Sequence, residues 1–288
     1  MAQQFLKALK TPRMLPRFPK KYFYLWAGCP ELTADAGFLP FSLSEWQETL
    51  RQHLRPNDYA HVACLFLAND HQNLLHFLTG KTQAPWLSPS VFSPEDIQES
   101  QYQTRHLRPY MAAFVQLFQE TKTEKASWEW ENILLDYFYA YARRYPHPFV
   151  RQWFGFEQDI KNILAAENCR QFGQNLAQHL IGQNELNELL RAKPLADTDF
   201  AQRWAYGPEI LHALQLDSLL AREQAFDRLR WQWLEDHSTF AYFQVENIFA
   251  FTAKLQIVAR WTTLKSPEAT HFWKELLDNL QKTMEKGF

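Results

Sequence analysis

Two Glu-x-x-His motifs carry the side chains best suited to metal chemistry, Glu209 with His212 and Glu268 with His271. In four-helix di-iron proteins, two such motifs project from facing helices and bind the metal together with two further glutamates. Here each glutamate directly follows a proline, which predicts the first turn of a helix, where an acidic side chain complements the helix dipole. We therefore favour an ordinary helix start over metal ligation, and an all-α metalloenzyme is the less favoured alternative.

Motifs for other chemistries are missing from the sequence. It contains no Gly-x-Ser-x-Gly elbow, no Gly-x-Gly-x-x-Gly loop and no Walker motif. The cysteines Cys29, Cys64 and Cys169 are far apart and form no Cys-x-x-Cys pair, so neither a disulfide framework nor a zinc knuckle is indicated. We predict no catalytic residue, no cofactor-binding residue and no metal ligand.

Composition favours a globular helical protein. Of the 288 residues, 46% are hydrophobic and 22% charged, which is ordinary for a folded chain. The net charge of -2 argues against binding nucleic acid through bulk charge. Only 8 glycines are present, far below the usual share of about 7%, which disfavours β-sandwiches and phosphate-binding loops. No run of residues is long and apolar enough for a membrane helix, and a reducing cytoplasm fits the scattered cysteines.

Local signals predict an all-α fold. Ser42 and Glu45 form a capping box, and Ser93 precedes a proline and two acids, which is typical of a helix start. No Asn-Gly or Asp-Gly hairpin turn occurs. The segment 22–26 is the one stretch with strand character, and it could equally form a buried helical turn. The longer predicted helices cover 46–54, 59–78, 124–145, 149–180, 217–236, 240–261 and 266–286, with shorter ones at 197–206 and 208–216.

A sequence motif recurs at nearly equal spacing. Asp70 and Asn73 belong to the pattern Asp-x-x-Asn-apolar-Leu, Asp159 and Asn162 repeat it, and Asn247 lies in a degraded copy with Gln in place of Asp. The asparagines are 89 (162 − 73) and 85 (247 − 162) residues apart. Because asparagine is a poor residue for the middle of a helix, we expect each to make a buried polar contact. The spacing predicts three similar helical lobes arranged around a pseudo-threefold axis.

Domain boundaries follow from this repeat. We interpret residues 1–20 as a solvated basic N-terminal extension; contact with an anionic membrane surface or an acidic partner is the functional alternative. Residues 21–288 form a single all-α body, with approximate lobes 21–108, 109–196 and 197–288.

Aromatic residues crowd onto adjacent positions in several helices. Neighbouring positions point in different directions, so some rings must face something other than one core. Tyrosine and arginine are favoured at protein interfaces. We therefore predict an interaction surface at Tyr137, Tyr141, Arg143 and Arg144.

Several segments resemble a bacterial family of uncharacterised proteins of the DUF2764 type, whose genes accompany those of V/A-type ATPases. That family is in turn similar to the stalk-socket protein of these ATPases, which forms the AC39 family in eukaryotes. The resembling segments are Tyr22-Phe23-Tyr24-Leu25-Trp26-Ala27-Gly28-Cys29-Pro30, Phe41-Ser42-Leu43, the run 69–75, the run 242–248 and the run 254–261.

The resemblance to the stalk-socket protein implies a structural role. Members of that family are funnel-like all-α bodies of three similar lobes that sit on the cytoplasmic face of the membrane rotor ring and receive the tip of the central stalk. They perform no reaction and bind no nucleotide. We therefore expect a non-catalytic rotor-coupling part of the ATPase that is cytoplasmic and peripheral to the inner membrane. Its expected partners are the central stalk and the rotor ring, and its expected process is proton or sodium transport. A free-standing helical adaptor that binds other proteins is the main alternative.

Overall fold

The computed structural model describes residues 21–34, 38–81, 83–121, 125–197 and 199–264. All regular secondary structure in these ranges is helical, and no strand occurs in them, which confirms the all-α prediction. Every helix among the described residues is too short or too polar to cross a lipid bilayer.

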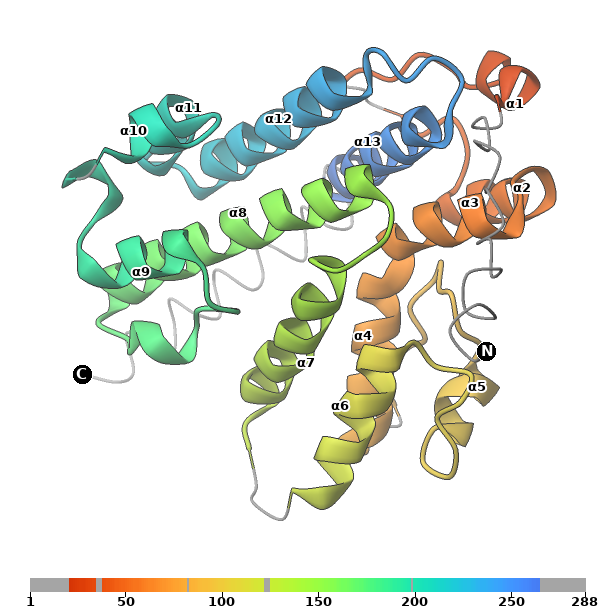
Figure 1. The fold of residues 1–288 in the computed structure, drawn as a ribbon, viewed down its shortest axis with the longest axis horizontal. Helices are drawn as coiled ribbons and strands as arrows, with labels where there is room; N and C mark the ends of the chain where they lie inside the picture. The colour runs from red at the N-terminus through yellow and green to blue at the C-terminus, as the bar shows by residue number, and fades with distance from the viewer. Residues whose placement is uncertain (1–20, 35–37, 82, 122–124, 198, 265–288) are drawn as a thin grey trace, which may run out of the picture.

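The helices follow one another with short connections (Figure 1). In chain order the elements are α1 (Phe23–Ala27), α2 (Leu43–His53), α3 (Pro56–Val62), η2 (Ala63–Phe66), α4 (Leu67–Leu78), α5 (Pro94–Glu99), α6 (Pro109–Glu120), α7 (Ser127–Ala142), α8 (Pro148–Phe172), η3 (Leu176–Gln178), α9 (Glu185–Ala192), η4 (Leu195–Asp197), α10 (Phe200–Arg203), α11 (Gly207–Leu214), α12 (Leu219–Ser238) and α13 (Val245–Leu264), where η marks a 3₁₀ helix.

Helix starts agree with the predicted caps. At α2 the Ser42 hydroxyl accepts a hydrogen bond from the Glu45 backbone N–H at 3.1 Å, and the Glu45 carboxylate accepts from the Ser42 N–H at 2.9 Å. Ser93 and Asp96 form the same reciprocal pair at α5. Each pair satisfies backbone donors that the first turn of a helix leaves unpaired, so the start is encoded locally.

The single helix predicted over 59–78 is wrong. A 3₁₀ segment, η2, separates α3 from α4, and all four of its residues are buried: Ala63, Cys64, Leu65 and Phe66. Four consecutive side chains of an α-helix spread around its axis, so some would point away from the core. The tighter turn lets the whole run contact the core.

Three other predicted boundaries differ from the structure. Helix α8 ends at Phe172 instead of 180, because Gly173 adopts a left-handed φ of 65° that closes its last turn. The sequence analysis did not predict α9, although Asn184 caps it by accepting from the Asn187 N–H at 2.8 Å. Segment 22–26 contributes to helix α1, but α1 contains no buried residue, so the predicted buried turn is instead exposed.

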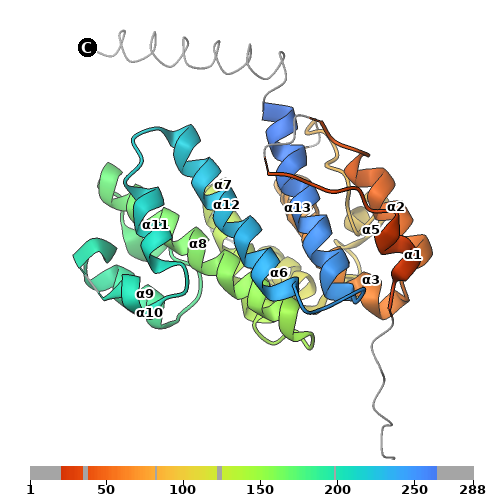
Figure 2. The ribbon, with the colours of Figure 1, turned by 90° about the horizontal axis from the view of Figure 1, so that it is seen from above.

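The buried side chains fall into two large clusters and one small cluster. The first joins α2–α7, the first half of α8 and most of α13. The second lies under α9–α12 and the second half of α8. A small third cluster lies between α12 and the end of α13. The 25-residue helix α8 therefore belongs to both large clusters and connects them. Figure 2 shows α12 and α13 side by side, with α2 and α3 on the other side of α13.

Candidate functional site

The first Asp-x-x-Asn copy, on α4, fixes the loop that follows this helix. The Asn73 amide donates to the Leu87 carbonyl at 3.0 Å and accepts from the Leu87 N–H at 2.9 Å. The buried Asp70 carboxylate accepts from the backbone N–H groups of Val91 at 2.9 Å and Phe92 at 3.1 Å. Asp70 and Asn73, termed the first loop anchor, thus satisfy backbone groups that burial removes from water.

The second copy, on α8, repeats this geometry and is termed the second loop anchor. The Asn162 amide donates to the Ile181 carbonyl at 2.9 Å and accepts from the Ile181 N–H at 2.8 Å. It also donates to the Asn187 side-chain oxygen at 2.9 Å. Asp159 accepts from the side-chain amide of Asn184 at 3.1 Å. In both anchors a helix asparagine exchanges two hydrogen bonds with one backbone residue further along the chain.

Gly182 completes the second loop anchor. Its backbone has a left-handed φ of 74°, and an added Cβ would lie 2.5 Å from the Gln158 side-chain nitrogen. Its N–H donates to Asp136 on α7 at 2.7 Å, and its carbonyl accepts from Asn187 at 2.9 Å. Only glycine combines this backbone conformation with so close an approach.

The third copy does not share this arrangement. Asn247 lies in the first turn of α13, and its amide donates to the Ser238 carbonyl at 3.4 Å, upstream instead of downstream. Its side-chain oxygen is buried and has no hydrogen-bond partner among the described residues. Two copies therefore have matching geometry, and the three-lobe arrangement stays a prediction.

Burial dominates the electrostatics of both anchor carboxylates. It raises the pKa of Asp70 to about 6, against the opposing effect of the Val91 and Phe92 N–H groups. It likewise raises the pKa of Asp159 to about 6, while the hydrogen bond from Asn184 acts in the other direction. Since both carboxylates accept hydrogen bonds from the chain itself, their arrangement serves to hold loops.

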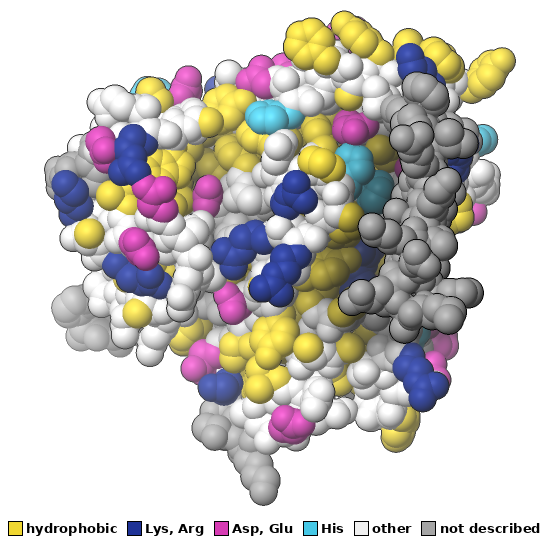
Figure 3. All heavy atoms as spheres, viewed as in Figure 1, with side chains coloured by type: hydrophobic (Ala, Val, Ile, Leu, Met, Phe, Trp, Pro, Cys, Tyr) yellow, Lys and Arg dark blue, Asp and Glu magenta, His cyan; other side chains and the backbone are white. Residues whose placement is uncertain are grey.

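The predicted interface residues have mixed surroundings. The half-buried Tyr137 packs against Phe114, with ring centroids 6.5 Å apart. The Tyr141 hydroxyl accepts from the Arg108 guanidinium at 3.1 Å, and Arg143 donates to the backbone of the second loop anchor, at the carbonyl of residue 183, at 3.4 Å. Arg144 is exposed. Figure 3 shows Lys and Arg side chains gathered near the middle of this face, where α7 and α8 meet. A partner for these residues stays a prediction.

The first Glu-x-x-His motif lies on the surface. Glu209 is exposed and His212 lies beside it on α11, whereas Glu268 and His271 lie outside the described residues. Across the part of the chain that the structure describes, no group of three or more His, Cys, Asp or Glu side chains is placed to hold a metal ion.

An exposed row of rings was not predicted from the sequence. Phe23 and Tyr24 on α1 are 51% and 96% exposed, and Phe240 and Tyr242 in the α12–α13 connection are 84% and 61% exposed. These four residues are termed the aromatic edge. Figure 3 shows hydrophobic side chains along the top of the molecule, over α1 and this connection.

The backbone beneath the aromatic edge is held in place by long-range contacts. The N–H of the buried Tyr22 donates to the Phe243 carbonyl at 2.6 Å, and the Tyr22 hydroxyl donates to Asp58. The rings of Phe23 and Phe243 lie 4.6 Å apart. Phe243 has a φ of 61°, a left-handed conformation that costs a bulky residue energy and persists only where surrounding contacts impose it. The rings are therefore displayed on a fixed backbone.

A groove of about 580 Å³ continues the aromatic edge. Tyr24 forms one side of it, and Leu25, Pro40, Phe41 and Trp46 line its apolar wall between α1 and α2. The Phe41 and Trp46 rings stack with centroids 5.3 Å apart.

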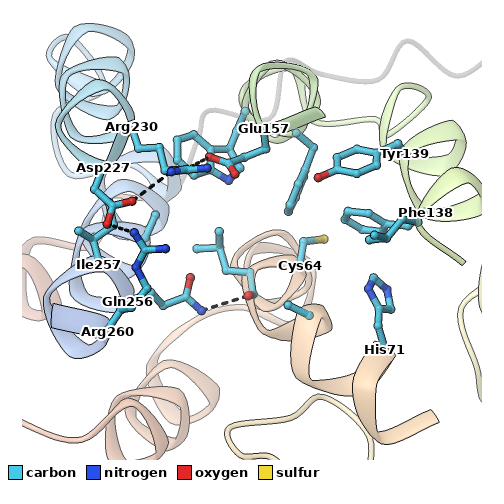
Figure 4. A pocket seen from close by; sticks show the side chains of 16 residues that line it. Cys64, His71, Phe138, Tyr139, Glu157, Asp227, Arg230, Gln256, Ile257 and Arg260 are labelled. Atoms are coloured by element: carbon cyan, nitrogen blue, oxygen red, sulfur yellow. Dashed lines mark hydrogen bonds and ion pairs between the residues drawn. The ribbon is translucent and has the colours of Figure 1, made fainter. Parts of the chain in front are cut away.

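A second hollow lies between the two halves of the molecule and carries a charged network (Figure 4). Arg230 on α12 donates to Glu157 on α8 at 2.8 Å and to Asp227 at 3.1 Å. Asp227 also accepts from Arg260 and, at 2.7 Å, from the Trp261 indole on α13. The network joins α8, α12 and α13 with two cations and two carboxylates.

Comparison with protein families gives one match. Residues 20–284 match the model of DUF2764, described as a protein of unknown function. No curated protein and no solved structure is similar enough to match the chain. Because the matching region covers most of the 288 residues, the chain belongs to the DUF2764 family of proteins of unknown function.

Proposed function

We propose that this chain is a non-catalytic coupling subunit of a V/A-type ATPase, which binds the central stalk and the membrane rotor ring and uses the aromatic edge as a contact surface. In that role it lies at the cytoplasmic face of the membrane and transmits rotation during proton or sodium transport.

The observation that carries the proposal is where the resembling segments meet. The runs 22–30 and 242–248 are both part of the resemblance to the ATPase-associated family. They are far apart in sequence, yet the hydrogen bond from Tyr22 to Phe243 joins them, and together they contribute most of the aromatic edge. Exposed aromatic rings beside an apolar groove are typical of protein interfaces.

The loop anchors support a part that transmits force. Asn73 and Asn162 each tie a connection to a helix by two hydrogen bonds from buried side chains. Connections held in this way deform less than solvated loops, because opening them leaves buried polar groups unpaired.

Co-purification tests the proposal. The full chain, tagged and expressed in its own organism, is expected to bring down the stalk and ring subunits of the ATPase. Replacing Tyr24 and Phe240 together by serine should remove them, whereas Phe172→Ser, at an exposed ring on the end of α8, should not. Absence of every ATPase subunit from the wild-type sample would overturn the proposal. Edge-dependent capture of another defined complex would identify the chain as an adaptor instead.

A further inference from the structure

The hollow between α4, α7, α8, α12 and α13 has the character of a binding pocket. Its volume is about 330 Å³. Figure 4 shows two unlike sides: the charged network of α8, α12 and α13 on one, and the side chains of η2, α4 and α7 on the other. The second side is mainly apolar, with Cys64, Leu135, Phe138, Trp153 and Phe154 in its wall. Pockets that combine an apolar wall with a few converging polar groups are typical small-molecule sites.

Tyr139 places an unpartnered hydroxyl in this pocket. The residue is only 7% exposed, and its hydroxyl points into the hollow (Figure 4). Among the described residues, no group exchanges a hydrogen bond with this oxygen. Burial, and secondarily the Glu157 carboxylate, raise the pKa of Tyr139 above its usual value, so the hydroxyl stays protonated and can donate. A buried hydroxyl without a partner is costly, so a partner from outside the chain is expected.

The charged side restricts the charge of that partner. Arg230 and Arg260 face Glu157 and Asp227, so the cations and carboxylates of the network balance. An added anion would lie beside two carboxylates and an added cation beside two guanidinium groups, and either would carry an unpaired charge into a partly dry site. Tyr139 donates, and the remaining N–H groups of Arg230 can only donate. The site therefore suits a neutral group that accepts hydrogen bonds.

We propose that this pocket binds a neutral, largely apolar small molecule through a carbonyl-type oxygen, which accepts a hydrogen bond from the Tyr139 hydroxyl while the apolar part lies against Phe138 and Trp153. The proposal does not depend on the ATPase role.

Matched probes test both the acceptor and the charge. Acetophenone carries a carbonyl next to an aromatic ring, ethylbenzene lacks the oxygen, and benzoate adds a negative charge. Ligand-observed NMR on the full chain should give acetophenone a dissociation constant on the order of 1 mM, as expected for so small a probe. Ethylbenzene should bind about 2–10-fold more weakly, the usual effect of one neutral hydrogen bond, and benzoate more weakly still.

Two variants separate the hydroxyl from the pocket. Tyr139→Phe removes only the oxygen, so acetophenone should weaken about 2–10-fold while ethylbenzene is unchanged. Tyr137→Phe, on the same helix outside this pocket, is the matched control and should change neither. Ala68→Trp, at an exposed residue of the pocket wall, should block both probes.

Three results would overturn the proposal. They are no binding of acetophenone at 10-fold above the expected constant (on the order of 10 mM), equal loss of acetophenone and ethylbenzene in Tyr139→Phe, and tighter binding of benzoate than of acetophenone.

Discussion

Asn162 and Ile181 exchange two hydrogen bonds, 2.9 Å and 2.8 Å long, through which a helix side chain substitutes for a backbone partner. Asn73 and Leu87 make the same exchange in the first half of the molecule, at 3.0 Å and 2.9 Å. The repeated sequence motif thus corresponds to a repeated physical task, which is to hold a buried connection against the helix before it.

Loss of the second loop anchor should be costly. Asn162→Ala leaves the Ile181 N–H buried without its acceptor, so we expect the free energy of unfolding to fall by about 2–4 kcal/mol. Urea denaturation measures this difference. Asn247→Ala is the matched control, with an expected loss below about 1 kcal/mol, because its one bond is long and its oxygen already lacks a partner. Equal losses in the two variants would contradict the distinction between the copies.

Gly182→Ala should also destabilise the second loop anchor. The new methyl group would meet the Gln158 amide at 2.5 Å, and the φ of 74° disfavours any side chain. We expect a loss of about 1–3 kcal/mol in thermal or urea unfolding. Gly155→Ala on α8, where an added Cβ meets nothing within 4 Å, should leave stability unchanged or raise it by up to about 1 kcal/mol. A neutral result at position 182 would show that this loop can move aside.

The first loop anchor should make stability depend on pH. The pKa of Asp70 is raised to about 6 in the folded state and is about 3.9 in an unfolded chain, so between these values the folded state binds more protons. Its contribution to the free energy of unfolding is therefore fully present below about pH 4 and is lost as the pH rises through about 6.

Asp70→Asn isolates this contribution. The difference in unfolding free energy between wild type and variant should shift against the wild type by about 1–3 kcal/mol from pH 4 to pH 7. Urea denaturation at a series of pH values gives the curve. A constant difference across this range would mean that the Asp70 pKa is not raised.

The charged network should matter more than the surface ion pairs. Asp227→Ala leaves Arg260 and the Trp261 indole without their shared acceptor and removes one partner of the buried Arg230, for an expected loss of about 3–5 kcal/mol. Asp199→Ala, which breaks an exposed pair with Arg203, should cost less than about 1 kcal/mol. Thermal unfolding distinguishes them, and similar small losses in both would show that the network contributes little.

Local signals predicted much of the fold and of the loop anchors. Ser42 and Ser93 mark helix starts because their partners lie three residues away. Asn73 and Asn162 were identified as buried polar residues because asparagine suits the middle of a helix so poorly. The backbone groups that they bind lie 14 and 19 residues further on, a distance over which no local pattern acts.

The features that the sequence analysis missed depend on distant parts of the chain. The rings of Tyr24 and Phe240 are indistinguishable by type from core aromatics, and their exposure follows from how α1 meets the α12–α13 connection. The pairing of Arg230 with Glu157 joins residues 73 positions apart. The break at η2 reflects a core that surrounds four consecutive residues, which only the packed structure defines.

Site-specific photocrosslinking tests the central claim most directly. A benzophenone amino acid in place of Phe240 keeps an aromatic ring at a position that is 84% exposed, and the same residue in place of Phe172 serves as the control. After irradiation of cells, mass spectrometry should identify a stalk or rotor-ring subunit of the V/A-type ATPase attached at position 240 and not at 172. Crosslinks from position 240 to other proteins alone, or none to the ATPase, would contradict a role in rotor coupling.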